Sequence, residues 1–205
     1  MSEAEQTTLE LIHKAAMKEF LEKGYKSASL RNIVKTAGVT TGAFYGYYDS
    51  KEELFAALVK EPYDWVLDCF RKAQQEFAGL PKREQTENLG TVSGACMHEM
   101  LLYAFAHLDE FQLILCQAEG TRFSKLIDEM AEIETKGTHD YLQVLTELGR
   151  PAPEIDEHLE HILITGMFNT FFEMIIHKMP LAKAEHYLKE MRAFYTAGWM
   201  KIMGQ

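Results

Sequence analysis

Apolar residues recur every three or four positions along most of the chain, which is the spacing of one face of an α-helix. The first such segment carries Leu11, Ala15 and Phe20 at this spacing, and Gly24 follows it as a helix-ending glycine. No stretch alternates apolar and polar residues as a half-buried strand does. The pattern therefore predicts an all-α fold with about nine helices.

Two short helical segments follow the first one and are separated by a tight link. Ser29 is expected to cap the earlier segment, Gly38 to end it with a positive φ, and Thr40 to cap the later segment, which reaches Tyr48. Short helices joined by a glycine-containing turn are typical of the helix-turn-helix motif. We therefore predict a three-helix DNA-binding domain over residues 1–50.

Residues 51–205 are expected to form a second, larger helical domain. Asp49 or Ser50 should cap its first helix, and Pro62 should kink that helix or make it restart, because proline has no N–H to donate. A loop is predicted over residues 149–153, where glycine and two prolines lie close together. Five further helices are predicted near residues 86–107, 109–118, 122–148, 155–178 and 181–202.

The charge of the chain is unevenly distributed. The 205 residues carry a net charge of −10, yet residues 1–60 hold eight Lys or Arg against eight Asp or Glu and are neutral. Because an acidic surface repels phosphate, any contact with DNA is expected from this neutral region. The acidic N-terminus has no signal-peptide pattern, no apolar run is long enough for a membrane span, and the three cysteines are expected to be reduced thiols. A cytoplasmic location without membrane contact is therefore expected.

The segment over residues 40–48 is predicted to have a buried face and a DNA-facing one. Phe44 and Tyr48 are four residues apart and should pack in the core. The opposite face, which would enter the major groove, presents Thr41, Gly42, Tyr45, Gly46 and Tyr47. The two glycines should weaken a helix by about 1 kcal/mol each. They are either tolerated substitutions or positions where the backbone approaches the bases closely.

These residues resemble the tetracycline-repressor (TetR) family of bacterial regulators. The resemblance is carried by AAMKEFLEKGY at 15–25 and SLRNIVKTAGVTTGAFYGYYDSKEEL at 29–54. It implies DNA contacts through the second and third helices and the start of the fourth, with tyrosine hydroxyls and a lysine meeting phosphate. The residues concerned are Ser29, Arg31, Thr40, Thr41, Gly42, Ala43, Tyr45, Gly46, Tyr47 and Lys51. At Gly46 and Tyr47 the chain departs from the commoner family residues, which are larger or basic at the first position and histidine or asparagine at the second.

The resemblance also implies a ligand-sensing and dimerising role for residues 51–205. The last two long helices are expected to pair with a second copy, and the interface is expected to include Ile162, Gly166, Phe171, Met174, Phe194 and Trp199. A pocket is expected between the helices of 86–148 and the start of 155–178. Its expected lining is Met97, Met100, Leu101, Tyr103, Phe105, Phe111, Leu115, Phe123, Met130 and Phe168, although such a stripe also suits a filled core.

Other chemistry is weakly represented in the sequence. His158 and His161 lie three residues apart beside Glu157 and Glu160 and could hold a divalent ion, but a solvated helix surface is the favoured interpretation. No catalytic residue, metal or cofactor is expected. The leading hypothesis is a homodimeric repressor that leaves a near-palindromic double-stranded DNA operator when it binds a small apolar or amphipathic effector. The alternative is an all-helical ligand carrier or enzyme with a vestigial helix-turn-helix.

Overall fold

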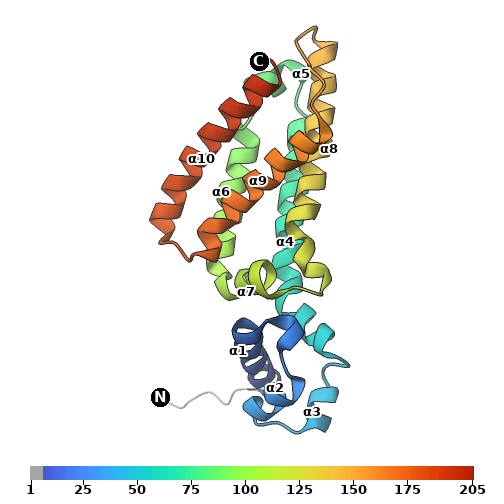
Figure 1. Ribbon diagram of the computed structural model, residues 1–205, viewed down its shortest axis with the longest axis vertical. Coiled ribbons are helices and arrows are strands. Elements are labelled where there is room, and N and C mark those ends of the chain that lie inside the picture. Colours follow the sequence, from blue (N-terminus) through green and yellow to red (C-terminus); the bar gives the residue numbers. More distant parts are fainter. Residues whose placement is uncertain (1–6) are drawn as a thin grey trace. The chain divides into compact units, whose positions relative to one another are not determined.

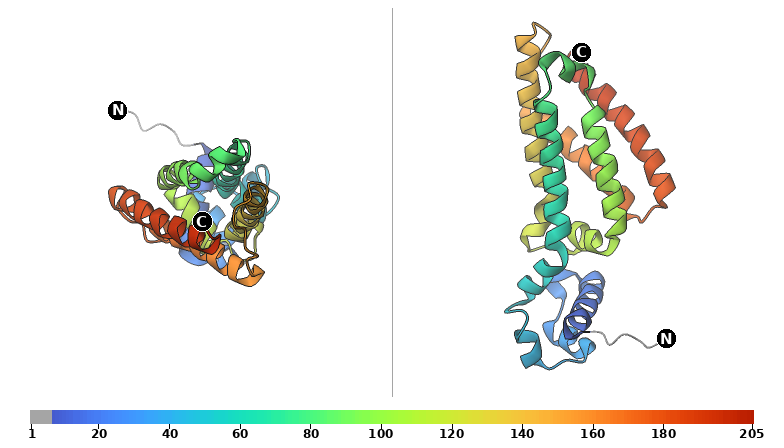
Figure 2. Two further views of the ribbon diagram at one scale, coloured as in Figure 1. Left: turned by 90° about the horizontal axis from the view of Figure 1, so that it is seen from above. Right: turned by 180° about the vertical axis from the view of Figure 1, so that it is seen from behind.

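The computed structural model describes residues 7–205, and this part of the chain is helical without a strand (Figures 1 and 2). The prediction of an all-α fold is confirmed. The α-helices are α1 (Thr8–Ser27), α2 (Leu30–Ala37), α3 (Thr41–Tyr45), α4 (Lys51–Ala78), α5 (Lys82–Glu87), α6 (Thr91–Ala106), α7 (Leu108–Gln112), α8 (Leu126–Glu147), α9 (Glu157–Ile176) and α10 (Leu181–Ile202). A π-helical turn, Leu113–Gln117, and a 3₁₀ turn, Arg122–Lys125, lie between α7 and α8.

Two departures from the predicted helices concern their continuity. Helix α4 continues through Pro62, so the helix does not restart there. The helix predicted over 86–107 is instead two helices, because Gly90 adopts a positive φ of 82° between α5 and α6. This break makes α5 the additional helix, and the described part of the chain has ten α-helices where about nine were predicted.

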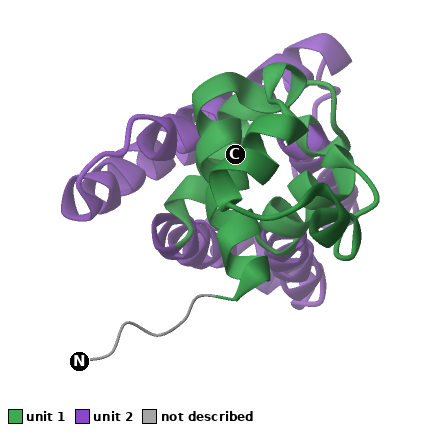
Figure 3. Ribbon diagram, turned by 90° about the horizontal axis from the view of Figure 1, so that it is seen from below, with its two compact units in different colours: residues 1–63, 107–124 green, residues 64–106, 125–205 purple. Residues whose placement is uncertain are grey.

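The chain divides into two compact units, which Figure 3 shows in different colours. Unit 1 comprises residues 1–63 with 107–124, and unit 2 comprises residues 64–106 with 125–205. Unit 1 thus extends past residue 50 and includes a later segment of the chain. The division of function at residues 1–50 and 51–205 stays a prediction.

Unit 1 packs its helices around an aromatic core. Phe20 and Phe55 are fully buried and meet edge to face, with ring centroids 5.0 Å apart. Phe123, from the later segment, lies 6.0 Å from Phe55 and 5.2 Å from Tyr63. The start of α4 and residues 107–124 therefore belong to the same core as the helix-turn-helix, because their aromatic rings complete it.

A buried carboxylate joins α1 to α2 inside unit 1. Gly24 breaks the helical geometry near the end of α1 with a φ of 72°. Glu19 Oε1 accepts hydrogen bonds from the backbone N–H of Ser29 and from Lys23 Nζ, both at 3.0 Å, and from Asn32 Nδ2 at 3.5 Å. The hydrogen bond from Ser29 N–H is the main reason why the pKa of Glu19 lies below its usual value. These contacts fix the position at which α2 begins.

Unit 2 is a bundle of longer helices with its own core. Phe70 on α4 meets Phe168 on α9 edge to face at 5.3 Å, and α9 packs against α8 and α10. Helix α9 is, among the described helices, the one long and apolar enough to cross a membrane, with a mean hydropathy of 1.2. Core helices of soluble proteins share this composition, and Phe168, Phe171 and Ile175 of α9 are fully buried in unit 2.

Candidate functional site

Helices α2 and α3 form the helix-turn-helix of unit 1 (Figure 1). Local caps hold both helices. Ser29 Oγ accepts a hydrogen bond from Asn32 N at 3.4 Å, and Thr40 Oγ1 accepts one from Ala43 N at 3.1 Å. Gly38 between the two helices has a φ of 69°, and its N–H donates to the last carbonyls of α2. Both predicted caps and the predicted glycine turn are confirmed, and they set the angle between α2 and α3.

Helix α3 and the turn after it carry both buried and exposed aromatic residues. Phe44 is fully buried, and Tyr48 is half-buried with its hydroxyl hydrogen-bonded to His13 Nε2. Burial lowers the pKa of His13 and raises that of Tyr48, so both groups are favoured in their neutral forms. Tyr45 and Tyr47 are 53% and 48% exposed. Two tyrosines on one short stretch thus face outward, as expected of residues that meet a partner.

Neither Gly42 nor Gly46 has a positive φ, although a Cβ on Gly46 would lie 3.3 Å from the carbonyl oxygen of Ala43. The helix ends at Tyr45, three residues earlier than predicted, and Gly46 follows it with an ordinary φ of −75°. A Cβ on Gly42 would meet nothing nearer than Thr40 Oγ1 at 4.0 Å. Because alanine would fit at position 42, the structure of the protomer supplies no reason for the missing side chain there.

The lysine that begins α4 is engaged within unit 1. Lys51 Nζ donates to the carbonyls of Tyr25 at 2.6 Å, Ala28 at 3.0 Å and Lys26 at 3.3 Å, and lies 4.6 Å from the centroid of the Tyr25 ring. These contacts satisfy carbonyls at the end of α1, which have no intrahelical partner. The ammonium that was predicted to meet phosphate therefore has three protein acceptors for its three N–H groups.

The other predicted DNA-contacting residues lie on α2, on α3 and in the adjoining turns. Arg31, Thr40, Thr41, Gly42 and Gly46 are exposed, whereas Ser29 and Ala43 are half-buried. The α4 N-terminus is capped by Ser50, whose Oγ accepts from Glu53 N at 3.0 Å. The face of α2 and α3 that remains open is thus polar, with Arg31 as its predicted cation.

The predicted ligand-lining residues fall mainly in the cores of the two units. Phe111, Leu115 and Phe123 belong to unit 1, and Tyr103 stacks on Trp65 at 3.8 Å. Met100, Leu101, Met130 and Phe168 are fully buried core residues, and Phe105 is half-buried. Of the predicted set, Met97 is the member that lines the cavity described next. The other members do not line this cavity, because helical spacing does not distinguish a core position from a cavity wall, and their role in ligand binding stays a prediction.

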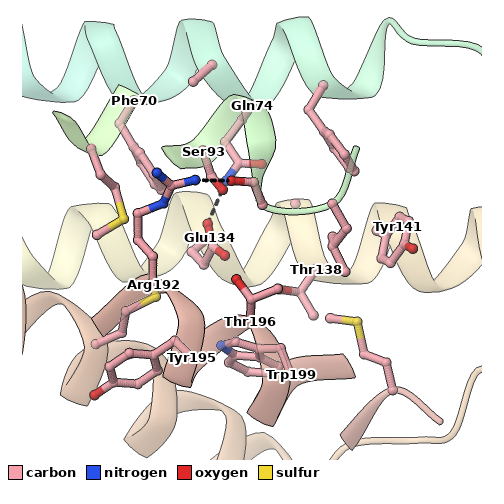
Figure 4. Close-up of a pocket in the computed structure, with 18 of the residues that line it drawn as sticks. Phe70, Gln74, Ser93, Glu134, Thr138, Tyr141, Arg192, Tyr195, Thr196 and Trp199 are labelled. Atoms are coloured by element: carbon pink, nitrogen blue, oxygen red, sulfur yellow. Dashed lines mark hydrogen bonds between the residues drawn. The ribbon is translucent and has the colours of Figure 1, made fainter. Parts of the chain in front are cut away.

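Unit 2 contains a cavity of about 110 Å³ between α4, α6, α8, α9 and α10 (Figure 4). Its walls are largely apolar, with aromatic rings and methionines from these helices. The polar side chains that line it include Gln74, Ser93, Glu134 and Arg192. Gln74 Nε2 donates to Glu134 Oε2 at 2.5 Å, and Arg192 Nη2 donates to the carbonyl of Gly90 at 2.8 Å. Burial raises the pKa of Glu134 to about 7, which leaves its carboxyl partly protonated near neutral pH.

Two glycines inside helices make room for these polar side chains. A Cβ on Gly94 of α6 would lie 1.5 Å from Arg192 Nη2, and a Cβ on Gly137 of α8 would lie 2.4 Å from Gln74 Oε1. Glycine in a helix interior costs about 1 kcal/mol relative to alanine. The sequence analysis missed Gln74, Glu134 and Arg192, although helix-interior glycines are a signal that something approaches the backbone closely.

The His-Glu segment at the start of α9 has a different role from the predicted one. Glu160 is 2% exposed and its Oε2 lies 2.9 Å from His139 Nε2, so the prediction of a solvated surface was wrong for this residue. His158 and His161 are exposed. Within residues 7–205 no three His, Cys, Asp or Glu side chains are grouped so as to hold a metal ion.

The predicted dimer residues separate into exposed and buried ones. Ile162 on α9 and Phe194 on α10 are 64% and 73% exposed. Phe171 and Met174 are buried inside unit 2 and are not available to a second copy, because the helix turns them toward the core. Gly166 is half-buried, and Trp199 lines the cavity.

Comparison with known proteins relates the chain to bacterial regulators. Residues 12–58 match the family model of "Bacterial regulatory proteins, tetR family". The HTH-type transcriptional regulator TtgR of Pseudomonas putida is 32% identical over 107 residues, which are 52% of this chain and 44% of that protein. The HTH-type transcriptional repressor KstR2 of Mycobacterium tuberculosis is 27% identical over 145 residues, 71% and 70% of the two chains. The chain spans between about a fifth and about half of the first curated relatives that it matches.

Solved structures show the same fold along almost the whole chain. SCO3833, a TetR-family member from Streptomyces coelicolor, superposes with a TM-score of 0.61 over 97% of this chain and 93% of its own, at 16% identity. The fatty acid degradation regulator FadR from Bacillus halodurans has a TM-score of 0.54 at 18% identity and covers 96% of this chain and 98% of its own. At these identities the likeness establishes the fold.

Proposed function

We propose, from the premise that this chain belongs to the tetR family of bacterial regulatory proteins, that it is a ligand-responsive, DNA-binding transcriptional repressor. The observation that carries the proposal is the exposure of two tyrosines of a capped helix-turn-helix, Tyr45 at the end of α3 and Tyr47 in the turn after it. Such a helix enters the major groove, and its hydroxyls can donate to phosphate or to base edges. The cavity of unit 2 would receive the effector.

A homodimer would allow two such helices to act together. Helix-turn-helix dimers bind half-sites about 34–36 Å apart, and the symmetry of the operator matches that of the protein. Ile162 and Phe194 support a second copy on α9 and α10, because exposed apolar side chains of this size favour burial. Effector binding would favour a conformation with a different half-site spacing and so release the operator. This regulation of transcription would take place in the cytoplasm.

The test is a gel-shift assay with DNA that flanks the chromosomal gene of this protein. The wild type is expected to retain a specific fragment in the presence of competitor DNA. Tyr45→Phe and Tyr47→Phe remove only a hydroxyl, and each is expected to weaken retention about tenfold because a hydrogen bond to a charged phosphate is lost. Tyr187→Phe, on the exposed face of α10, is the matched control and should bind as the wild type does.

Two results would count against the proposal. Unchanged binding by the double variant of Tyr45 and Tyr47 would show that α3 does not contact DNA through these hydroxyls. Absence of specific retention by the wild type would contradict the regulatory function and favour the alternative of a ligand carrier or enzyme. Circular dichroism on each variant verifies that the helical fold is intact.

A further inference from the structure

We propose that the cavity of unit 2 binds a small organic carboxylate with an apolar body, and that the guanidinium of Arg192 holds the carboxylate. The proposal deepens the proposed function, on which it rests for the description of this ligand as an effector. The cavity itself, its polar groups and its apolar walls are properties of unit 2.

Arg192 enters the cavity with most of its hydrogen-bonding capacity unused. Of its five N–H donors, one has an acceptor among the described residues, the carbonyl of Gly90 at 2.8 Å. No ion pair joins its guanidinium to a carboxylate of residues 7–205, although Glu134 lines the same cavity. A cation without a counter-ion in a largely apolar cavity is a binding site for an anion, and a planar guanidinium matches a carboxylate with two parallel hydrogen bonds.

The fold provides a seat for this guanidinium. Gly94 lies in the interior of α6 and is buried, and any side chain there would occupy the space of Arg192 Nη2 and Cζ. Gly137 on α8 gives the same freedom to the amide of Gln74, which donates to Glu134. Figure 4 shows Arg192, Ser93, Gln74 and Glu134 entering the cavity from different helices. Two helices thus lack a side chain where a polar group lines the cavity.

Glu134 is the group that could instead favour a cationic ligand. Its carboxyl already accepts a hydrogen bond from Gln74, and burial raises its pKa to about 7, so it becomes neutral at little cost. Arginine cannot lose its charge in a protein. The demand for a counter-ion therefore falls on Arg192, and a protonated Glu134 can donate a hydrogen bond to the bound anion.

The apolar part of the cavity sets the size of the ligand. Phe70, Tyr141, Met167 and Trp199 contribute flat or flexible apolar surface around a volume of about 110 Å³. An engineered apolar cavity of roughly 150 Å³ holds a benzene molecule. The body of the ligand is therefore comparable to a single ring or a short alkyl chain.

Three probes with one carbon skeleton and different charge test the proposal: 3-phenylpropanoate, 3-phenylpropylammonium and 3-phenylpropan-1-ol. Each is titrated into the full chain carrying Trp65→Phe, in which Trp199, at the cavity, is the remaining tryptophan and is excited selectively. The carboxylate is expected to bind more than about tenfold more tightly than the ammonium and the alcohol, because it alone pairs with the guanidinium.

Variants assign that preference to Arg192. Arg192→Gln removes the charge, and Gly94→Ala displaces the guanidinium without removing it; both should abolish the preference for the carboxylate while the alcohol still binds. Lys189→Gln removes an exposed charge from the same helix and should leave all three affinities within twofold. Glu134→Gln should leave the carboxylate preference in place.

The outcomes are distinct. Three results would each overturn the proposal. The first is a preference for the ammonium that Glu134→Gln removes, and the second is equal affinity for all three probes. The third is a carboxylate preference that survives in Arg192→Gln. Failure of the proposed function is separate, because it appears as loss of specific DNA retention in the gel shift without any probe. Retention of DNA together with no probe binding would refute the cavity assignment alone.

Discussion

Lys51 offers a test that separates a structural role from a DNA contact. Its ammonium donates to three carbonyls near the end of α1 and lies over the ring of Tyr25. Lys51→Met keeps the aliphatic part of the side chain and removes these contacts. We expect this variant to loosen the end of α1 in the absence of DNA, because the carbonyls of Tyr25 and Ala28 lose a charged donor.

The size of the effect follows from the contacts. A hydrogen bond to a charged group contributes about 1.5–3 kcal/mol, and a cation above an aromatic ring adds about 0.5–1 kcal/mol at an exposed site. The three hydrogen bonds share one half-buried ammonium and are not additive, since water can replace part of each. A loss of about 2–3 kcal/mol is expected, which corresponds to a roughly 30- to 150-fold larger population of the open end of α1.

Hydrogen exchange measured by mass spectrometry on peptides covering residues 20–35 reports this opening directly. Lys14→Met removes an exposed lysine from α1 itself. It is the matched control and should exchange as the wild type does. Exchange in Lys51→Met within threefold of the wild type would refute the structural role. If such a variant also lost DNA binding, the ammonium would contact phosphate instead.

Two further predictions concern the dimer and the buried carboxylate. Ile162→Asp and Phe194→Asp should each convert a dimer into a monomer at micromolar concentration in analytical ultracentrifugation. The control Leu102→Asp, exposed on α6, should stay a dimer. The same oligomeric state in all three variants would contradict the proposed interface. Glu19→Gln should lower the free energy of unfolding by about 1–2 kcal/mol at pH 7. Because the pKa of Glu19 is lowered from 4.5, this difference from the wild type should shrink as the pH falls below about 4.5, and a constant difference down to pH 3 in urea denaturation would contradict it.

The fold was largely predictable because its signals are local. Ser29, Gly38 and Thr40 act on backbone groups three or four residues away, and the sequence shows them next to the helices that they delimit. Of the two outcomes predicted at Pro62, a kink or a restart, the restart does not occur, because α4 runs on through the proline. The break at Gly90 was missed because a glycine in the sequence does not reveal the sign of its φ.

The site was less predictable because its parts meet through tertiary packing. Lys51 reaches the end of α1 across more than twenty residues, and no spacing in the sequence indicates this contact. In the sequence, Arg192 is one of several charges on an amphipathic helix. Its place in the cavity depends on Gly94, almost a hundred residues earlier. Phe171 and Met174 were assigned to an interface because α9 is apolar on most sides, whereas packing in unit 2 decides which side is free.

The two glycines in α3 and directly after it bear on how many different operators the protein could bind. Gly42 and Gly46 occupy positions of the predicted DNA-facing surface and have no side chain with which to read a base edge. On the proposed function, base pairs opposite these glycines would be selected by groove width and flexibility rather than by hydrogen bonds. Such a protein would tolerate substitutions at those base pairs. Its binding sites in a genome would resemble one another in half-site spacing and DNA shape more closely than in base sequence.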